Sequence, residues 1–251
     1  MPHFENGGVL LDYLDEGEGP VVVLVHGFAS NRAVNWVNTG WVTALARAGH
    51  RVLAPDNRGH GRSARLYEPA LYTAPTMAGD VIALLDHVGV RRAVLMGYSM
   101  GARISAFATL AAPERVRGLV LSGLASALVD GIGGEEAIAR ALEAPSAAAV
   151  TEPHARAFRV FAEQTGSDLR ALAACIRAAR QSLTREDVGR IAAPTLVVAG
   201  ENDDIAGSAD VLAAMMPVAR AVTLPGRDHM TAVGDRIHKA EVLAFLDALD
   251  G

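Results

Sequence analysis

Short runs of aliphatic residues recur along the chain, separated by segments in which apolar residues have helical spacing. The clearest run is Val21–Val25, five consecutive aliphatic residues of a kind typical of a strand covered on both faces. Runs of the same character lie at 51–54, 93–96, 118–121, 195–199 and 221–224. Because buried strands that alternate with helices form mostly parallel sheets, the pattern predicts an α/β fold with helices on both faces of the sheet.

The helices are predicted from apolar residues that recur every three or four positions. Segments with this spacing lie at 42–48, 77–88, 100–111, 209–216 and 237–249. Near the N-terminus, Asn6-Gly7-Gly8 is a hairpin signal, because Asn-Gly adopts positive φ at little cost. It precedes the apolar stretch 9–14, so we expect a hairpin that adds an antiparallel edge to the sheet.

One stretch interrupts the alternation. Residues 124–191 contain no strand-like run, only helical segments at 135–142, 156–163 and 169–183. A helical insertion between two strands is naturally placed over the end of the sheet. The sequence therefore predicts a core domain made of 1–123 and 192–251, with 124–191 as a helical lid.

Composition narrows the class of protein. The formal net charge is −5 and the basic residues are scattered, so no basic stripe is available to follow a nucleic-acid backbone. The single cysteine, Cys175, cannot form an intramolecular disulfide and is expected to be a passive packing residue. No signal peptide and no membrane-spanning apolar stretch is recognisable. These features predict a cytoplasmic enzyme without a nucleic-acid or membrane partner and leave the oligomeric state open.

The strongest local motif is Gly-Tyr-Ser-Met-Gly at 97–101, between a predicted strand and a predicted helix. A serine on such a tight turn has its hydroxyl projected above the sheet, and small residues two positions away on each side let neighbouring backbone approach. The helix that follows brings free N–H groups and positive potential to the same point. Ser99 is therefore the candidate nucleophile.

A second motif, His26-Gly27-Phe28, directly follows the strand Val21–Val25. A loop at this place can direct the backbone N–H of Phe28 toward the same point as that of Met100. Two preorganised donors of this kind form an oxyanion hole. We expect His26 itself to support the loop rather than to act as the base.

A serine hydroxyl needs a base, and the base needs an acid that orients it. His229 lies in a loop after the strand 221–224, which places it at the same end of the sheet as Ser99, whereas His60 is its main competitor. Asp203 follows the preceding strand and is the candidate acid. Its rivals are Asp204, Glu201 and, less suitably because it adjoins the base in sequence, Asp228.

The order Ser, Asp, His, each just past a strand, is the order of α/β-hydrolases. The chain resembles that superfamily over essentially its whole length, and within it small bacterial esterases, lactonases and cofactor-free haloperoxidase-like hydrolases. The matching motifs lie at 26–28, 56–63, 97–101, 200–203 and 228–229. The resemblance implies the α/β-hydrolase fold and a structural role for Arg58 and His60. A departure is Asp228, where the base motif often has Gly. Serine rather than aspartate at position 99 argues against the haloalkane dehalogenase and epoxide hydrolase branches.

The predicted reaction is hydrolysis of carboxylic esters with small to medium acyl groups, through an acyl-enzyme at Ser99, with no metal and no organic cofactor. The alternatives with the same triad are a lactone hydrolase, a carbon–carbon bond hydrolase and a perhydrolase; a non-catalytic ligand receptor on this fold is the alternative of another class. The expected partner is a small-molecule ester. Predicted substrate-binding residues are Trp36, Leu124, Leu128, Phe158 and Met230.

Overall fold

The computed structural model describes residues 2–250 and has one central sheet. Its strands are β1 (His3–Asn6), β2 (Val9–Glu16), β3 (Val21–Val25), β4 (Arg51–Pro55), β5 (Ala93–Tyr98), β6 (Val116–Ser122), β7 (Thr195–Gly200) and β8 (Ala219–Leu224). The helices are α1 (Trp41–Arg47), α2 (Ala74–His87), α3 (Met100–Ala111), α4 (Ala127–Asp130), α5 (Glu135–Glu143), α6 (Pro153–Gln164), α7 (Leu169–Ile176), α8 (Arg185–Gly189), α9 (Ala209–Ala213) and α10 (Arg236–Asp250). None of the helices in 2–250 is both long and apolar enough to cross a bilayer.

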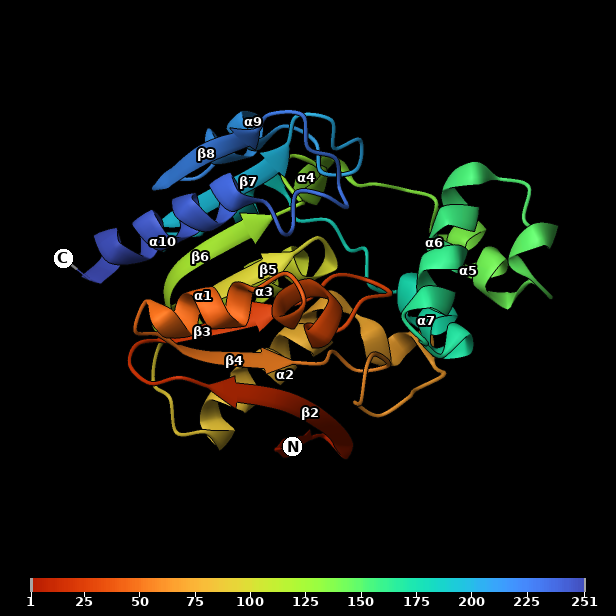
Figure 1. The fold of residues 1–251 in the computed structure, drawn as a ribbon, viewed down its shortest axis with the longest axis horizontal. Coiled ribbons are helices and arrows are strands. Elements are labelled where there is room, and N and C mark those ends of the chain that lie inside the picture. The colour runs from red at the N-terminus through yellow and green to blue at the C-terminus, as the bar shows by residue number, and fades with distance from the viewer. Residues whose placement is uncertain (1, 251) are drawn as a thin grey trace.

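The strand order is β1-β2-β4-β3-β5-β6-β7-β8 (Figure 1). The pairs β1–β2 and β2–β4 are antiparallel, and all pairs from β4 to β8 are parallel. The hairpin at Asn6-Gly7-Gly8 has Gly7 and Gly8 at positive φ, as its sequence predicts. The prediction of a mostly parallel α/β sheet with an antiparallel edge is therefore confirmed.

Alternate residues of the central strands enter two separate core layers. In β3, Val23 and Val25 pack in the layer with α2 and α3, whereas Val22 and Leu24 pack in the layer with α1 and α10. This two-sided burial explains why the strand has no polar positions. The helices on each side bury their own apolar faces against it.

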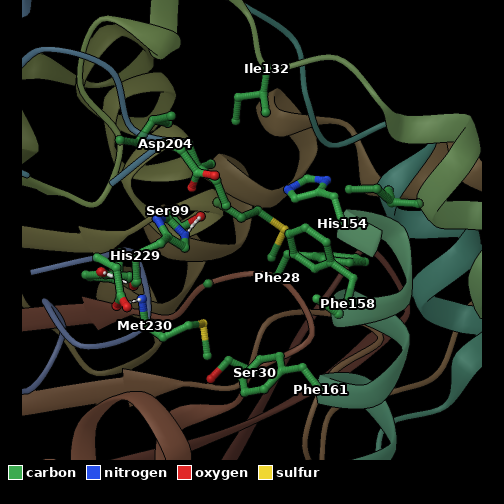
Figure 2. A pocket seen from close by; sticks show the side chains of 18 of the residues that line it. Phe28, Ser30, Ser99, Ile132, His154, Phe158, Phe161, Asp204, His229 and Met230 are labelled. Carbon is green, nitrogen blue, oxygen red and sulfur yellow. Dashed lines mark hydrogen bonds between the residues drawn. The ribbon is translucent and has the colours of Figure 1, made fainter. Parts of the chain in front are cut away.

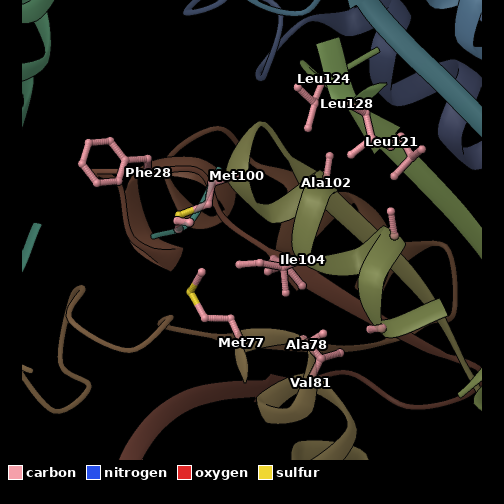
Figure 3. Packing of buried hydrophobic residues seen from close by; sticks show 14 of the residues in the cluster. Phe28, Met77, Ala78, Val81, Met100, Ala102, Ile104, Leu121, Leu124 and Leu128 are labelled. Carbon is pink, nitrogen blue, oxygen red and sulfur yellow. The ribbon is translucent and has the colours of Figure 1, made fainter. Parts of the chain in front are cut away.

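The layer beneath α3 anchors the segment that carries Ser99. Figure 3 shows Met100, Ala102 and Ile104 of α3 packed among side chains of α2 and β6. Ala102 and Ile104 are fully buried. The N-terminus of α3 is therefore fixed by packing on its buried side.

Helices α5, α6 and α7 lie together beyond the carboxyl ends of the parallel strands (Figure 1). By contrast, α4 lies against the core, because the N–H groups of Ala125 and Ala127 donate to the carbonyl of Ala206. The helix predicted at 169–183 ends at Ile176 instead. The segment after α7 is not part of this helix, and its Gln181 side chain accepts a hydrogen bond from the N–H of Ala74 in the core.

Candidate active site

Ser99 lies on a strained turn between β5 and α3. Its backbone has φ 54° and ψ −114°, a conformation that non-glycine residues rarely adopt. A Cβ atom at Gly97 would overlap the backbone of Gly101, and one at Gly101 would overlap the backbone of Val25. The glycines of the motif are therefore required by close backbone approach.

Three side chains from distant loops form one hydrogen-bonded line, of which Figure 2 draws Ser99 and His229. His229 Nε2 is 3.1 Å from Ser99 Oγ, and His229 Nδ1 is 2.9 Å from Asp203 Oδ2 and 3.0 Å from Oδ1. With a carboxylate at Nδ1, that nitrogen carries the proton and Nε2 is free to accept one. The structure thus brings together the three residues that the sequence singled out for nucleophile, base and acid.

The carboxylate of Asp203 is held in place by the backbone around it. Its Oδ1 accepts the N–H groups of Ile205 (3.0 Å) and Ala206 (2.9 Å), and its side chain has no exposed surface, against 14 % for that of His229. Asp228, the sequence neighbour of the base, instead accepts hydrogen bonds from the backbone of Met230 and the backbone and hydroxyl of Thr231. Among the carboxylates of residues 2–250, only that of Asp203 is therefore hydrogen-bonded to the imidazole of His229.

Tyr98 orients the histidine loop in a way that the sequence did not reveal. Its hydroxyl donates to the carbonyl of His229 at 2.6 Å, and the two rings lie 5.5 Å apart. Burial raises the pKa of Tyr98 well above its usual value, so the phenol stays protonated and remains a donor. The only signal was an aromatic residue directly before the nucleophile.

The loop after β3 leaves one N–H group free beside Ser99. The N–H of Gly27 donates to Asn35 Oδ1 at 2.8 Å, and that of Ala29 donates to His60 Nε2 at 3.2 Å. Between them, the N–H of Phe28 has no acceptor within residues 2–250, and neither has that of Met100. Ala29 has φ 57°, and it shares a positive φ with no other non-glycine residue of the described chain except Ser99. Backbone strain therefore falls on both sides of this site.

Two buried histidines support that loop, as expected from the sequence. His26 Nε2 accepts the N–H of Asn57 at 2.9 Å, and His60 Nδ1 bonds the carbonyl of Arg58 at 2.9 Å. Burial lowers the pKa of His26 to about 4 and that of His60 to about 3. Both rings are neutral at pH 7 and can accept the backbone N–H groups that they hold.

A cavity of about 750 Å³ opens over Ser99 and has a mostly apolar wall. Figure 2 shows Ser99 and His229 on one side of it and Phe158 and Phe161 of α6 on the other. Of the predicted substrate-binding residues, Leu124, Phe158 and Met230 are in this wall. Within residues 2–250, no three His, Cys, Asp or Glu side chains are grouped as a metal ion requires.

Two predictions for the pocket are wrong. Trp36 has no exposed surface and packs edge-on against Trp41, in the core layer under α1 and α10. The Trp36 side chain points inward because Ala33–Val37 forms a π-helical turn. Leu128 is also fully buried, because α4 lies against the core and places it beside α3 (Figure 3).

Comparisons with known proteins support the fold. The α/β hydrolase fold family matches residues 20–131. A hydrolase from Pseudomonas aeruginosa superposes with a TM-score of 0.77 and 29% identity, over 98% of this chain and 97% of its own. Est816, described as an N-acyl homoserine lactone degrading enzyme, gives a TM-score of 0.74 and 26% identity, over 98% of this chain and 99% of its own.

Comparison by sequence, rather than by structure, finds similarity to epoxide hydrolases. An epoxide hydrolase from Caballeronia sordidicola is 38% identical over 110 residues, which are 44% of this chain and 32% of that protein. The matched segment thus spans about a third of the relative's length. The sheet order, the strained serine turn and both kinds of similarity agree on one conclusion. The chain has the α/β-hydrolase fold.

Proposed function

We propose that this protein is a serine hydrolase that cleaves carboxylic esters through an acyl-enzyme at Ser99. The observation that carries the proposal is the hydrogen-bonded line Ser99–His229–Asp203, which opens into the cavity. The free N–H groups of Phe28 and Met100 beside it suit the oxyanion of a tetrahedral intermediate.

In the acylation step, Ser99 Oγ attacks the ester carbonyl and its proton passes to His229 Nε2. Asp203, which already accepts the Nδ1 proton, stabilises the imidazolium that forms. The negative charge on the carbonyl oxygen is then placed between the N–H groups of Phe28 and Met100. His229 gives its proton to the departing alkoxide, so that the alcohol leaves neutral.

Deacylation repeats these roles with water as the nucleophile. His229 takes a proton from the water, the hydroxide adds to the acyl carbon, and the proton returns to Ser99 Oγ as the acid leaves. The mostly apolar cavity suits the hydrocarbon part of a small or medium acyl group. The same groups would open a lactone, since a lactone is a cyclic ester, and the likeness to Est816 supports lactones as the second candidate.

Epoxide hydrolysis is disfavoured by the nucleophile itself. A carboxylate that opens an epoxide forms an ester, whose carbonyl water can then attack. A serine oxygen would form an alkyl ether, which has no carbonyl and would block the site. Position 99 is serine in this chain, so the similarity to epoxide hydrolases over 110 residues is attributed to the shared fold.

The test is a panel of p-nitrophenyl esters of rising acyl length, with homoserine lactones, a dienoic diketone and styrene oxide alongside. We expect turnover of the short and medium esters and stoichiometric labelling of Ser99 by a fluorophosphonate probe, both abolished in Ser99→Ala. Faster turnover of the lactone or of the diketone would replace the ester proposal. A folded protein that neither reacts with the probe nor turns over any compound would favour a ligand receptor.

A further inference from the structure

The cavity over Ser99 contains a buried arginine that forms no salt bridge within residues 2–250. Arg103 lies one helical turn after Ser99 on α3, lines the cavity, and is only 1 % exposed. Its Nη1 donates to the carbonyl of Gln181, while its Nη2 has no hydrogen-bond partner in the described chain. Burial of a charged donor without an acceptor is costly, so such a group calls for an explanation.

A second arginine lines the same cavity from the segment after α7. Arg180 donates to the carbonyl of Gly133, and its guanidinium carbon lies 6.0 Å from the centre of the Phe158 ring. Burial and, after it, the charge of Arg180 lower the pKa of Arg103 to about 10. Two like charges thus act on each other across one low-dielectric space.

The other buried arginines of the chain are treated differently. Arg58 pairs with Asp80 at 2.5 Å, Arg159 pairs with Glu163 at 2.8 Å, and Arg32 pairs with Asp12 and Asp56. Neither Arg103 nor Arg180 has a carboxylate within 4.0 Å in residues 2–250. The other buried guanidinium groups are thus in direct salt bridges, whereas Arg103 and the partly buried Arg180 are influenced only by the more distant carboxylate of Glu135.

Charge is also distributed unevenly around the cavity. The two carboxylates in the cavity wall, Asp204 and Asp228, come from the loops that carry Asp203 and His229. The carboxylate of Asp228 already accepts hydrogen bonds from backbone N–H groups of its own turn. On the opposite side, Arg156 of α6 adds to the positive charge of Arg180. A ligand with a negative end would therefore orient with that end toward the helical insertion.

We propose that the substrate carries a carboxylate at an end remote from the scissile bond, and that Arg180 binds it with the charge of Arg103 behind it. This rests on the proposed function, since the scissile ester is placed at Ser99. A carboxylate there would supply the directly contacting counter-charge that residues 2–250 do not provide, and could accept parallel hydrogen bonds from the guanidinium group.

The test compares esters with and without a carboxylate remote from the scissile bond. Mono-p-nitrophenyl adipate is compared with p-nitrophenyl hexanoate for the acyl half, and 4-carboxyphenyl with phenyl hexanoate for the alcohol half. We expect kcat/KM to be about tenfold or more higher for the anionic member of one pair. In Arg180→Gln that preference is lost, because kcat/KM falls much more for the anionic ester than for the neutral one, and Arg180→Lys recovers part of it.

Arg177→Gln is the matched control, because it removes the same charge three residues away. Arg177 pairs with Glu136 and Glu143 and is absent from the cavity wall, so the preference should not change. Equal or lower kcat/KM for the anionic member of both pairs would overturn the inference while leaving the proposed esterase intact.

A binding measurement makes the inference independent of turnover. Titration calorimetry of adipate into Ser99→Ala should show binding that Arg180→Gln weakens about tenfold or more and that Arg177→Gln leaves unchanged. If esters are not cleaved, this binding would still support the anion site and only the proposed reaction would fail. No heat of binding from adipate or from 4-carboxyphenol would overturn the anion site itself.

Discussion

Two serine–histidine pairs lie at the carboxyl ends of neighbouring strands in this molecule. Ser99 follows β5 and is 3.1 Å from His229, and Ser122 ends β6 and is 2.8 Å from His238. The pairs are also connected, since the carbonyl of Ser122 accepts the N–H of Ser99 at 2.8 Å. If the serine–histidine distance alone is considered, Ser122 and His238 are the better candidates for a nucleophile and its base.

Their surroundings separate them. The Nδ1 of His238 bonds the neutral carbonyl of Ala232, whereas that of His229 bonds the carboxylate of Asp203. His238 has no exposed surface, and burial lowers its pKa to about 4. A neutral, sealed imidazole can hold a serine in place but cannot become the imidazolium that catalysis needs. The comparison indicates that access, an ionised acid and free N–H donors distinguish a candidate reaction centre from a structural hydrogen bond.

The largest expected effect comes from removing each serine in turn. Ser99→Ala should lower ester turnover by about 10⁶-fold, as loss of a triad nucleophile does. Ser122→Ala should leave kcat near that of the parent protein. Because Ser122→Ala deprives buried His238 of its partner, it should lower the free energy of unfolding by about 1–3 kcal/mol. Initial rates and urea unfolding measure the two effects, and a comparable loss of kcat in both variants would contradict the distinction.

The second prediction concerns the group that faces Nδ1 of His229. A neutral group there would make the Ser99–His229 pair resemble the Ser122–His238 pair. Asp203→Asn replaces the carboxylate by a neutral amide and should lower kcat by about 10⁴-fold, because the imidazolium loses its counter-charge and the tautomer is no longer fixed. Asp204→Asn is the control, since Asp204 makes no hydrogen bond with His229. Near-normal rates in Asp203→Asn together with a large loss in Asp204→Asn would reassign the acid.

The third prediction concerns pH and the second pair. The pKa of His238 lies below its unfolded value, so between pH 6.5 and about 4 the unfolded chain binds a proton that the folded chain excludes. The contribution of His238 to stability should therefore be full above pH 7, fall as the pH drops through this window, and level off below it. For His238 alone the loss is about 3 kcal/mol, and His26 and His60 add to it in the same direction.

Urea unfolding at a series of pH values measures this dependence. In His238→Gln, whose amide can keep a donor and an acceptor, the protein should be less stable at pH 8 but should lose less stability on acidification. An unchanged slope between pH 6.5 and 4.5 in that variant would show that His238 does not contribute to the acid sensitivity.

The fold and the residues of the first pair could be predicted because each signal is local. Aliphatic runs mark the strands, and Ser99, Asp203 and His229 each follow a strand whose carboxyl end meets the others at one edge of the sheet. A strained serine turn additionally needs glycines at fixed positions, which a sequence displays directly.

What escaped prediction depends on contacts between distant segments. Trp36 and Leu128 are as apolar as Phe158, and only the direction of a π-helical turn and the docking of α4 decide that they are buried away from the cavity. Tyr98 acquires its role through the carbonyl of His229, 131 positions later in the chain. Hydrophobic patterning distinguishes buried from exposed positions, but it does not distinguish the wall of a cavity from the core beside it.

The smallest expected effect tests whether the helical insertion supports the first pair. Thr165, which follows α6, donates a hydrogen bond from Oγ1 to the carbonyl of Ala29 at 2.8 Å. Ala29 has a positive φ and is the residue directly after Phe28. Thr165→Val should therefore relax the loop and lower kcat by about tenfold, with KM changed less, because a displaced N–H of Phe28 weakens binding of the oxyanion more than that of the substrate. Thr165→Ser keeps the hydroxyl and should retain most of the rate. If both variants lose affinity and keep kcat, the insertion contributes to substrate binding alone, and the geometry of the first pair is determined entirely within the core.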